Sequence, residues 1–329
     1  MPSTRAVRIR ESGDPEVLEI GEIELPQPTP TQVMVQVSAA GLNRADCLQR
    51  RGLYPAPPGV PADVPGLELA GVVEAVGSEV NEWVPGDRVM GIVGGGGMAE
   101  RVVTEARQLM RVPEGLSLDQ AAAIPEVFLT AYDAVVLQGG LQRGESVLFH
   151  AVASGVGTAG IQLATVVGAT SVGTSRTADK LARCSSLGLD HAVLVDDGKF
   201  ADQVLQAVPG GVDVVLDTVG GAYLAQNLKV IATKGRIVVI GLMGGVKGEL
   251  ALGVLLGKRA SIRGSVLRSR SSDEKAELTA AFSREMLGKF ETGELQPIID
   301  DVLPMTEIQT AHARMDANET LGKLVLSWT

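Results

Sequence analysis

The residues with the clearest chemical potential form a short turn, Ser154-Gly155-Val156-Gly157, which joins an apolar run to an amphipathic run. Residues 146–151 are predicted to form a buried strand, and residues 156–167 a helix. Glycines let the main chain approach phosphates closely, and the first free N–H groups of a helix point at them from the positive end of the helix dipole. The turn therefore predicts a binding site for the pyrophosphate of a dinucleotide.

Two glycine spacings fit this turn. Gly155, Gly157 and Gly160 match G-x-G-x-x-G literally, whereas a register three residues earlier puts Val152, Ser154 and Gly157 at the glycine positions. The literal register places Gly160 in the first helical turns, where close packing of a helix on a strand can require a glycine. Spacing alone does not separate the two registers, and in both of them residues 154–157 lie at the pyrophosphate.

The end of the second strand bears on the choice of cofactor. NAD-binding proteins place an acid on the adenosine ribose about 20 residues past the turn. Here that position holds Ser175, with Arg176 beside it and Lys180 one helical turn further on. Because Arg and Lys attract a 2′-phosphate that a carboxylate would repel, these residues favour NADPH over NADH. Asp179 weakens this signal, and the alternative is ordinary solvated charge at a helix start.

Two later strands also end in glycine turns. Gly220 follows residues 212–217, and Gly241, Leu242 and Met243 follow residues 236–240. Ligands of open parallel sheets lie off the carboxyl ends of the strands, so we expect ribose and nicotinamide to contact these turns. The alternative reading of either turn is a simple connection between a strand and a helix.

The order of the predicted elements defines the fold class. Residues 1–125 are β-rich, and from about residue 118 strands and helices alternate, which is typical of parallel βαβ units. Strands are expected at 146–151, 169–174, 192–195, 212–217, 236–240 and 260–264, and helices at 156–167, 178–187, 200–208 and 222–232. A long helix is expected at 119–137, and a charged amphipathic one at 272–291. The sequence thus predicts an α/β protein in which a doubly wound, Rossmann-type parallel sheet, residues 126–264, is inserted in a β-rich catalytic domain made of 1–125 and 265–329.

Composition excludes several classes of partner. The formal net charge of -10 makes nucleic acid an unfavourable partner, because an acidic surface repels phosphate backbones. We see no apolar run long enough to cross a membrane and no signal-peptide stretch, so we expect no membrane contact. Only Cys47 and Cys184 occur, which favours a reducing cytoplasm over a disulfide framework.

Several motifs along the chain carry a family resemblance. They are Asn43-Arg44-Ala45-Asp46, Gln49-Arg50-Arg51-Gly52-Leu53-Tyr54, Ala121-Ala122-Ala123-Ile124-Pro125-Glu126, Gly241-Leu242-Met243-Gly244-Gly245, Leu267-Arg268-Ser269-Arg270 and Ala317-Asn318-Glu319-Thr320-Leu321-Gly322-Lys323. With these the chain resembles the zinc-independent NADPH:quinone oxidoreductases of the medium-chain dehydrogenase/reductase superfamily, and most of all their tumour-suppressor-inducible subgroup. The resemblance covers nearly the whole chain and implies that the β-rich catalytic domain is GroES-like.

The resemblance also implies roles for individual residues. Asn43 and Tyr54 would line the substrate side of the nicotinamide, where Tyr54 could donate a hydrogen bond or a proton to the reduced oxygen. Ser154 would contact both cofactor and substrate, Thr130 would approach the nicotinamide, and Lys323 is expected among the cofactor contacts. The alternative for Tyr54 is a loop tyrosine that only packs beside its neighbours.

No metal site is expected. Zinc alcohol dehydrogenases carry a metal cysteine near the position of Asn43 and a Gly-His-Glu motif, whereas this chain has Leu67 in place of that histidine. A catalytic zinc needs about three protein ligands of suitable type. His150, His191 and His312 lie in separate segments, so the sequence shows no cluster of ligands.

One departure from the family bears on the cofactor. Relatives often place a tyrosine after the third strand, against the adenosine 2′-phosphate, where this chain has Val195, Asp196 and Asp197. Valine cannot donate a hydrogen bond, and inward-pointing aspartates would repel phosphate. Dual use of NADH therefore stays open, with Lys180 carrying the preference for NADPH.

The expected reaction is hydride transfer from NADPH to a quinone or another electron-poor conjugated carbonyl. A reductase of enones or enoyl thioesters is the second hypothesis, with Arg268 and Arg270 as a hint of a coenzyme A thioester. A cofactor-binding structural protein with little turnover is the third. A homodimer is expected through the edge strand 260–264, which could pair with its copy across a two-fold axis.

Overall fold

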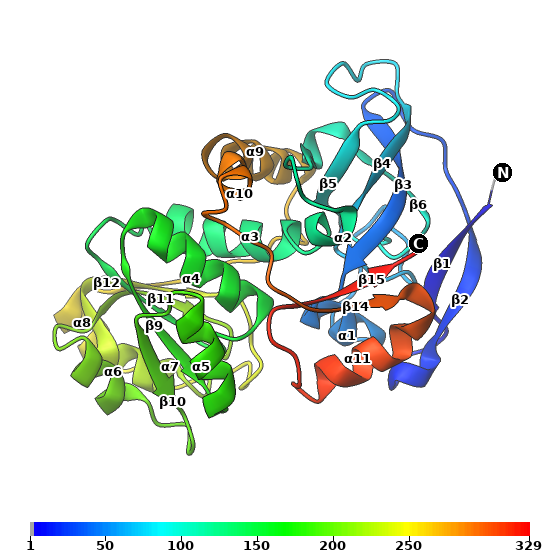
Figure 1. The fold of residues 1–329 in the computed structure, drawn as a ribbon. Helices are drawn as coiled ribbons and strands as arrows, with labels where there is room; N and C mark the ends of the chain where they lie inside the picture. The colour runs from blue at the N-terminus through cyan, green and yellow to red at the C-terminus, as the bar shows by residue number, and fades with distance from the viewer. Residues whose placement is uncertain (1–2) are drawn as a thin grey trace. The chain divides into compact units, whose positions relative to one another are not determined.

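The computed structural model describes residues 3–329 of the chain, which forms two compact units. The first segment of unit 1 ends at Leu129, and Leu267–Thr329 completes this unit. Unit 2 is the continuous segment Thr130–Val266, which Figure 1 shows in green to yellow. The units meet in the sequence at residues 129/130 and 266/267, where the sequence predicts domain boundaries at 125/126 and 264/265.

Unit 2 is built on a six-stranded parallel sheet in the strand order β10-β9-β8-β11-β12-β13. Its strands are β8(Ser146–Phe149), β9(Thr170–Ser175), β10(His191–Leu194), β11(Val212–Asp217), β12(Ile231–Val239) and β13(Ser261–Gly264). Numbered from β8, this order is 3-2-1-4-5-6, that of the doubly wound dinucleotide-binding fold. The predicted fold class of this unit is confirmed.

Helices connect the strands of unit 2, as the alternation in the sequence predicts (Figure 1). They are α4(Gly155–Val167), α5(Ala178–Ser186), α6(Ala201–Ala207), α7(Leu224–Val230) and α8(Leu252–Lys258). The central strand β8 is buried at every position, because helices cover both faces of a parallel sheet of this kind. Aliphatic side chains such as Leu148, Val172 and Val215 form the core around it.

Unit 1 contains a mostly antiparallel sheet in the order β14-β15-β3-β4-β5-β7, with β6 paired to β3, and a separate two-stranded sheet, β1-β2. The strands are β1(Ser3–Ile9), β2(Leu18–Glu24), β3(Gln32–Gly41), β4(Glu68–Val76), β5(Arg88–Ile92), β6(Arg101–Glu105), β7(Leu109–Arg111), β14(Ile299–Pro304) and β15(Lys323–Ser327). The helices are α1(Arg44–Arg50), α2(Leu118–Ala121), α9(Ser272–Phe282), α10(Gly288–Glu291) and α11(Ile308–Asp316), with short 3-10 turns at η1(Pro15–Val17), η2(Ala106–Gln108) and η5(Met305–Glu307). Because β15 pairs with β3, the C-terminal segment does fold back onto the N-terminal β-structure, as expected.

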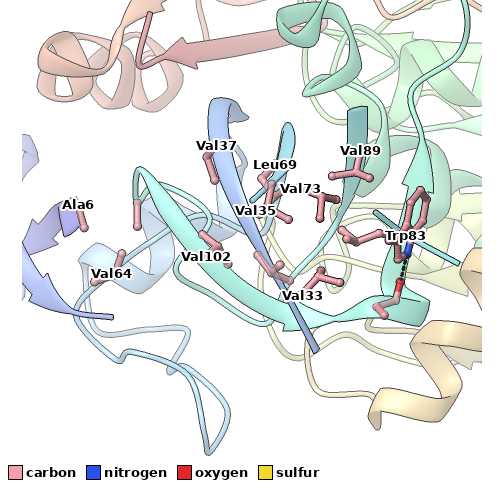
Figure 2. Packing of buried hydrophobic residues seen from close by; sticks show 14 residues of the cluster. Ala6, Val33, Val35, Val37, Val64, Leu69, Val73, Trp83, Val89 and Val102 are labelled. Carbon is pink, nitrogen blue, oxygen red and sulfur yellow. Dashed lines mark hydrogen bonds between the residues drawn. The ribbon is translucent and has the colours of Figure 1, made fainter. Parts of the chain in front are cut away.

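The core of unit 1 is aliphatic, as the low aromatic content of the chain requires. Figure 2 shows Val33, Val35 and Val37 of β3 packed with side chains of the neighbouring strands. Trp83 is the large aromatic member of this cluster, and its indole N–H donates to the Ala106 carbonyl at 3.0 Å. Burial of the indole therefore leaves no hydrogen-bond donor unpaired.

Some expected elements differ from those observed. The helix expected at 222–232 ends at Val230, because Ile231 already belongs to β12 and pairs with Val212 of β11. Residues 119–137 are not one regular helix: α2 ends at Ala121, α3(Pro125–Ala131) follows, and the π-helix η3(Tyr132–Gln138) completes the run. Pro125 marks the break, since proline disfavours helical backbone in the residue before it and suits the first position of a new helix.

Two further helical segments differ from those that the sequence predicts. The helix expected at 272–291 consists of α9, the π-helix η4(Ser283–Leu287) and α10. Helix α8 was not predicted, because its two glycines weaken the helical pattern. The expectation that no apolar run is long enough to cross a membrane was wrong. Among residues 3–329 the helical stretch Leu118–Gln138 alone has that length and apolar composition, and 72% of its apolar window is buried, as in a core helix.

A substitution at Gly160 tests the close contact between α4 and β8. A β-carbon at this position would lie 2.4 Å from Cε1 of the buried Phe149 ring. We expect Gly160→Ala to reduce stability by about 1–3 kcal/mol through overpacking. Thermal and urea unfolding measure this change.

Gly288 provides the matched control, since it has helical backbone and a β-carbon there would meet nothing within 4 Å. Gly288→Ala should leave stability unchanged or raise it by up to about 1 kcal/mol. Equal stability of the two variants would contradict the proposed packing constraint.

Candidate active site

The turn after β8 supplies unpaired main-chain amides. Ser154 caps α4, and its Oγ accepts a hydrogen bond from the Gly157 amide at 3.2 Å. Within residues 3–329, the amides of Gly155 and Val156 find no acceptor. They are the first two N–H groups of a helix of 13 residues, so they and the helix dipole suit an anionic group such as a pyrophosphate.

The two possible glycine registers assign the close contact to different residues, and the structure shows a close contact at both. A β-carbon on Gly157 would lie 2.3 Å from the Val152 carbonyl oxygen, and one on Gly160 would collide with Phe149. Gly157 therefore lets the helix start close to the turn, while Gly160 lets the helix lie on its own strand. Any side chain at Gly157 would displace the main chain that presents the amides.

The turns after β11 and β12 lie next to each other at the same edge of the sheet. The amides of Met243 and Gly244 donate to the carbonyls of Thr218 and Val219 at 3.3 and 2.7 Å. A β-carbon on Gly241 would lie 2.8 Å from the Thr218 oxygen, so only glycine fits there. Through these bonds the structure brings the predicted residues Gly220, Gly241, Leu242 and Met243 together, with Leu242 52% and Met243 54% exposed.

A network of buried polar side chains holds these turns in place. Asp217 accepts from the amides of Val219 and Gly220 through Oδ1, and from Asn227 Nδ2 through Oδ2. The Oδ1 of Asn227 then faces His150 Nε2 at 2.7 Å, so this nitrogen must carry the proton. The other ring nitrogen accepts from the Thr174 hydroxyl at 2.9 Å.

The same network gives His150 a structural function that the sequence did not reveal. The imidazole is fully buried, and burial lowers its pKa, which keeps it neutral. It joins the ends of β8, β9 and β11 to α7. The sequence feature that could have predicted this function is the occurrence of His150 and Asp217 at the ends of apolar strands.

The basic residues after β9 lie where the sequence predicts them. Ser175 ends the strand, Arg176 is exposed beside it, and Lys180 lies in the first turns of α5. Arg176 is close enough to Tyr223 to favour the ionised phenol, although burial still raises the pKa of this tyrosine. Thr130 is the first residue of unit 2 and is partly exposed.

In unit 1, a buried lysine pairs with a buried glutamate. The Lys323 ammonium donates to Glu68 Oε1 at 2.6 Å, to Asn43 Oδ1 at 2.8 Å and to the Leu42 carbonyl at 2.8 Å. All three of its protons are therefore used. Asn43 Nδ2 donates to the same Glu68 oxygen at 2.9 Å, so the predicted residues Asn43 and Lys323 belong to one network.

The sequence analysis did not identify Glu68, although the sequence contains a pattern that could have revealed it. Glu68 and Lys323 are single charges at the start of two apolar runs, each at least 96% buried in the structure. Opposite charges in two buried strands predict a buried ion pair. Their chain separation of 255 residues hid the pairing.

Two further acids lie close to this ion pair. Asp46 accepts from the amides of Asn43 and Gly66, yet burial raises its pKa to about 6. The main-chain amide of Glu126 donates to Glu68 Oε2 at 2.8 Å. Burial, and then the charge of Glu68, raise the pKa of Glu126 to about 8, so its carboxyl group is largely protonated at neutral pH.

Tyr54 lies on a loop that Arg268 holds. The Arg268 guanidinium donates to the Tyr54 carbonyl at 2.9 Å and stacks on the tyrosine ring at 5.0 Å from its centroid. Burial, reinforced by the charge of Glu126, raises the Tyr54 pKa, so the phenol keeps its proton and can donate a hydrogen bond. These contacts favour a defined position for Tyr54 over a loosely packed loop residue.

Neither unit assembles an evident metal site. Within residues 3–329 no group of three or more His, Cys, Asp or Glu side chains is arranged to hold a metal ion. Leu67 precedes Glu68, and the cation on that glutamate is the Lys323 ammonium. Independence from zinc stays a prediction.

The fold and the two sets of residues define a dehydrogenase-like oxidoreductase. Family models described as "Alcohol dehydrogenase GroES-like domain" and "Zinc-binding dehydrogenase" match residues 29–114 and 155–284. Human quinone oxidoreductase is 31% identical over 326 residues, which cover 98% of this chain and 97% of the human protein. The chain belongs to the medium-chain dehydrogenase/reductase superfamily, as its motifs predict.

Solved structures agree with this assignment. A quinone oxidoreductase of Pseudomonas syringae pv. tomato is 30% identical and superposes with a TM-score of 0.88, over 98% of this chain and 99% of that one. The CurK enoyl reductase is also 30% identical, with a TM-score of 0.87 and the same coverage. The relatives imply a nicotinamide cofactor, NAD or NADP.

The protonated carboxyl group of Glu126 gives a testable pH dependence of stability. The folded chain holds this proton up to about pH 8, whereas an unfolded glutamate releases it near pH 4.3. Stability therefore falls as pH rises through this window, by at most about 1.4 kcal/mol per pH unit for one group. Glu126→Gln should reduce the fall in melting temperature between pH 5 and pH 9.

The exposed Glu277 supplies the control, since Glu277→Gln should retain the wild-type dependence. If Glu126→Gln also retains it, Glu126 is ionised in the folded protein and the account of this cluster is wrong.

Proposed function

We propose that the protein is an NADPH-dependent reductase of quinones and related electron-poor conjugated carbonyls. The observation that carries the proposal is the pair of unbonded amides at the start of α4, beside the basic residues that follow β9. The nicotinamide supplies a hydride, and the protein supplies binding, orientation and electrostatics. The names of the quinone oxidoreductases from human and Pseudomonas syringae support the substrate class.

Three residues of unit 2 would select the 2′-phosphate of NADPH. Ser175 replaces the acid that would repel it, and Arg176 and Lys180 supply positive charge. Of the two aspartates after β10, Asp197 pairs with Lys199 at 2.9 Å and Asp196 is exposed. Because Lys199 pairs with Asp197, the negative charge of this aspartate would repel a nearby 2′-phosphate less strongly.

On the substrate side, we assign Tyr54 the hydrogen bond to the acceptor oxygen, and Asn43 and Ser154 supporting contacts. Asn43 is held by Glu68 and Lys323 on opposite ends of its amide, so its position is fixed before any ligand binds. Preorganised polar groups of this kind lower the cost of orienting a substrate. Thr130 would add a cofactor contact, whereas the ammonium of Lys323, whose three protons are already bonded, would act by holding Asn43.

The chemistry needs no zinc in this proposal. The ammonium of Lys323 neutralises Glu68, and Leu67 cannot ligate a metal. We also propose a cytoplasmic location, which agrees with two buried free thiols, Cys47 and Cys184.

The enoyl reductase hypothesis remains the second candidate, because the CurK enoyl reductase superposes as well as the quinone oxidoreductase does. Both reactions deliver a hydride to a polarised conjugated system. A panel of 1,4-quinones, enones and enoyl thioesters separates the two classes. Tight NADPH binding without turnover of any of them would favour the cofactor-binding structural protein.

The preference for NADPH is tested at Lys180. Lys180→Ala should raise the KM for NADPH about tenfold and leave the KM for NADH within about twofold, because only NADPH carries the 2′-phosphate. Lys229→Ala, at an exposed position of α7 in the same unit, should change neither value. Equal losses for both coenzymes would contradict the assignment of Lys180.

We further propose a homodimer formed through the edge strand β13. Within residues 3–329 this strand pairs with β12 alone, and α8, which comes just before it in the sequence, exposes Leu252 at 67% and Leu256 at 80%. An open sheet edge beside exposed leucines favours contact with a second copy across a two-fold axis.

The dimer is tested by sedimentation. Leu256→Lys should convert it to a monomer, because burying a lysine in an apolar contact is unfavourable. Val84→Lys, at a valine of unit 1 that is 59% exposed, should leave it dimeric. A monomeric wild-type protein would refute the proposed dimer.

A further inference from the structure

Lys275 of unit 1 is a mostly buried lysine whose ammonium group makes no hydrogen bond within residues 3–329. The residue is the fourth of α9 and is 7% exposed. In the described part of the chain, residues 3–329, its side chain makes no hydrogen bond and no ion pair. The two preceding acids are engaged elsewhere, Asp273 with Arg107 and Glu274 with Ser271. Burial of the side chain lowers the pKa of Lys275, but its Nζ atom is not fully enclosed and can be reached by water or a ligand.

The nitrogen of Lys275 lies over a largely apolar wall. A β-carbon built on Gly94 would be 3.9 Å from Lys275 Nζ and 3.3 Å from both Pro57 Cγ and Val60 Cγ1. The position of this β-carbon lies in van der Waals contact with the ammonium nitrogen and tighter against the two apolar side chains. The surroundings combine one unsatisfied charge with apolar side chains, which is typical of sites for small organic ligands.

The neighbouring cation, Arg268, is already engaged. It donates to the carbonyls of Gly94 and Tyr54 at 2.8 and 2.9 Å, and to Gln49 Oε1 at 2.7 Å. Arg268 thereby ties the Gly94 loop to the Tyr54 loop. Lys275 is left as the cation whose donors are available to a ligand.

Glu126 is the acid that interacts most with Lys275. When it is ionised, Glu126 raises the pKa of Lys275 against burial, and Lys275 in turn lowers the pKa of Glu126, yet the two groups form no ion pair within 4.0 Å. The Glu126 carboxyl group also makes no hydrogen bond of its own in residues 3–329. The two groups are therefore near each other but not in contact, and both have hydrogen-bonding capacity to spare.

We propose that Lys275 binds the carbonyl oxygen of the acceptor and stabilises the negative charge that this oxygen gains on reduction. The inference rests on the proposed function. NADPH gives two electrons as a hydride to a carbon of the conjugated system, the π electron pair moves to the carbonyl oxygen, and that oxygen then takes one proton from water. A fixed cation at the oxygen lowers the energy of the charged product and of the transition state that leads to it.

The first experiment measures binding of a product-like anion without turnover. 4-Nitrophenolate is titrated into the protein loaded with NADP⁺, at a pH at which the phenol is ionised, and followed by its absorbance. Lys275→Met should raise the dissociation constant about tenfold, and Lys275→Arg should restore part of the affinity. Lys289→Met, which removes a surface lysine paired with Glu294, should bind the anion as the wild type does.

The second experiment is steady-state reduction of a 1,4-quinone. Lys275→Met should lower kcat/KM for the quinone about 100-fold, with the KM for NADPH unchanged. Its melting temperature should equal or exceed that of the wild type, because methionine keeps the buried stem and removes an unpartnered charge.

Three results would overturn the proposal: wild-type affinity for nitrophenolate in Lys275→Met, wild-type kcat/KM in the same variant, or a lower melting temperature that marks Lys275 as a structural partner of Glu126. If the wild-type protein reduces no quinone, the proposed function fails separately, and the nitrophenolate titration still decides whether Lys275 is an anion-binding residue.

Discussion

A parallel sheet brings the carboxyl ends of all its strands to one edge, and this constraint determines where unit 2 can bind a ligand. The turns after β8, β11 and β12 meet there because β8 and β11 are neighbours, and so are β11 and β12. At the same edge, Ser154 caps α4, and the amides of Gly155 and Val156 have no acceptor within residues 3–329. The basic residues Arg176 and Lys180 follow β9, the strand next to β8.

The arrangement of this edge depends on buried polar groups as much as on glycines. Asp217, Asn227 and His150 form a chain of hydrogen bonds in which each proton has one consistent position. A satisfied network of this kind specifies one arrangement of its strands, since a partly satisfied one would leave buried polar atoms unpaired. Bonds within the protein therefore hold the turns that we propose as cofactor contacts.

Unit 1 contains a buried ion pair, Glu68–Lys323. A buried glutamate needs a cation, and in this chain Lys323 provides it with all three of its protons bonded. The ion pair leaves no net charge to offset the nearby acids Asp46 and Glu126, so burial raises the pKa of both. The result is a cluster in unit 1 with one acid that is largely protonated at neutral pH, Glu126, an asparagine held at both ends of its amide, and a tyrosine that retains its proton.

The sequence predicted what depends on local pattern. The strand, turn and helix around Ser154 are contiguous, so their residue types reveal both the fold of unit 2 and the candidate phosphate site. The network of Asn43, Glu68, Glu126 and Lys323 comes from four distant segments, and no spacing in the chain connects them. The start of β12 was missed for the same reason, because pairing of Ile231 with Val212 overrides the local helical pattern.

The most direct test is a calorimetric titration of NADPH and NADH into the purified protein, in the presence of a chelator that removes divalent metals. The central claim is that main-chain amides at the start of α4 bind the pyrophosphate and that no metal is needed. It predicts one NADPH bound per chain, more tightly than NADH, and loss of binding of both coenzymes in Gly157→Val, whose side chain would displace the turn. Absence of binding by either coenzyme, or full binding by Gly157→Val, would contradict it.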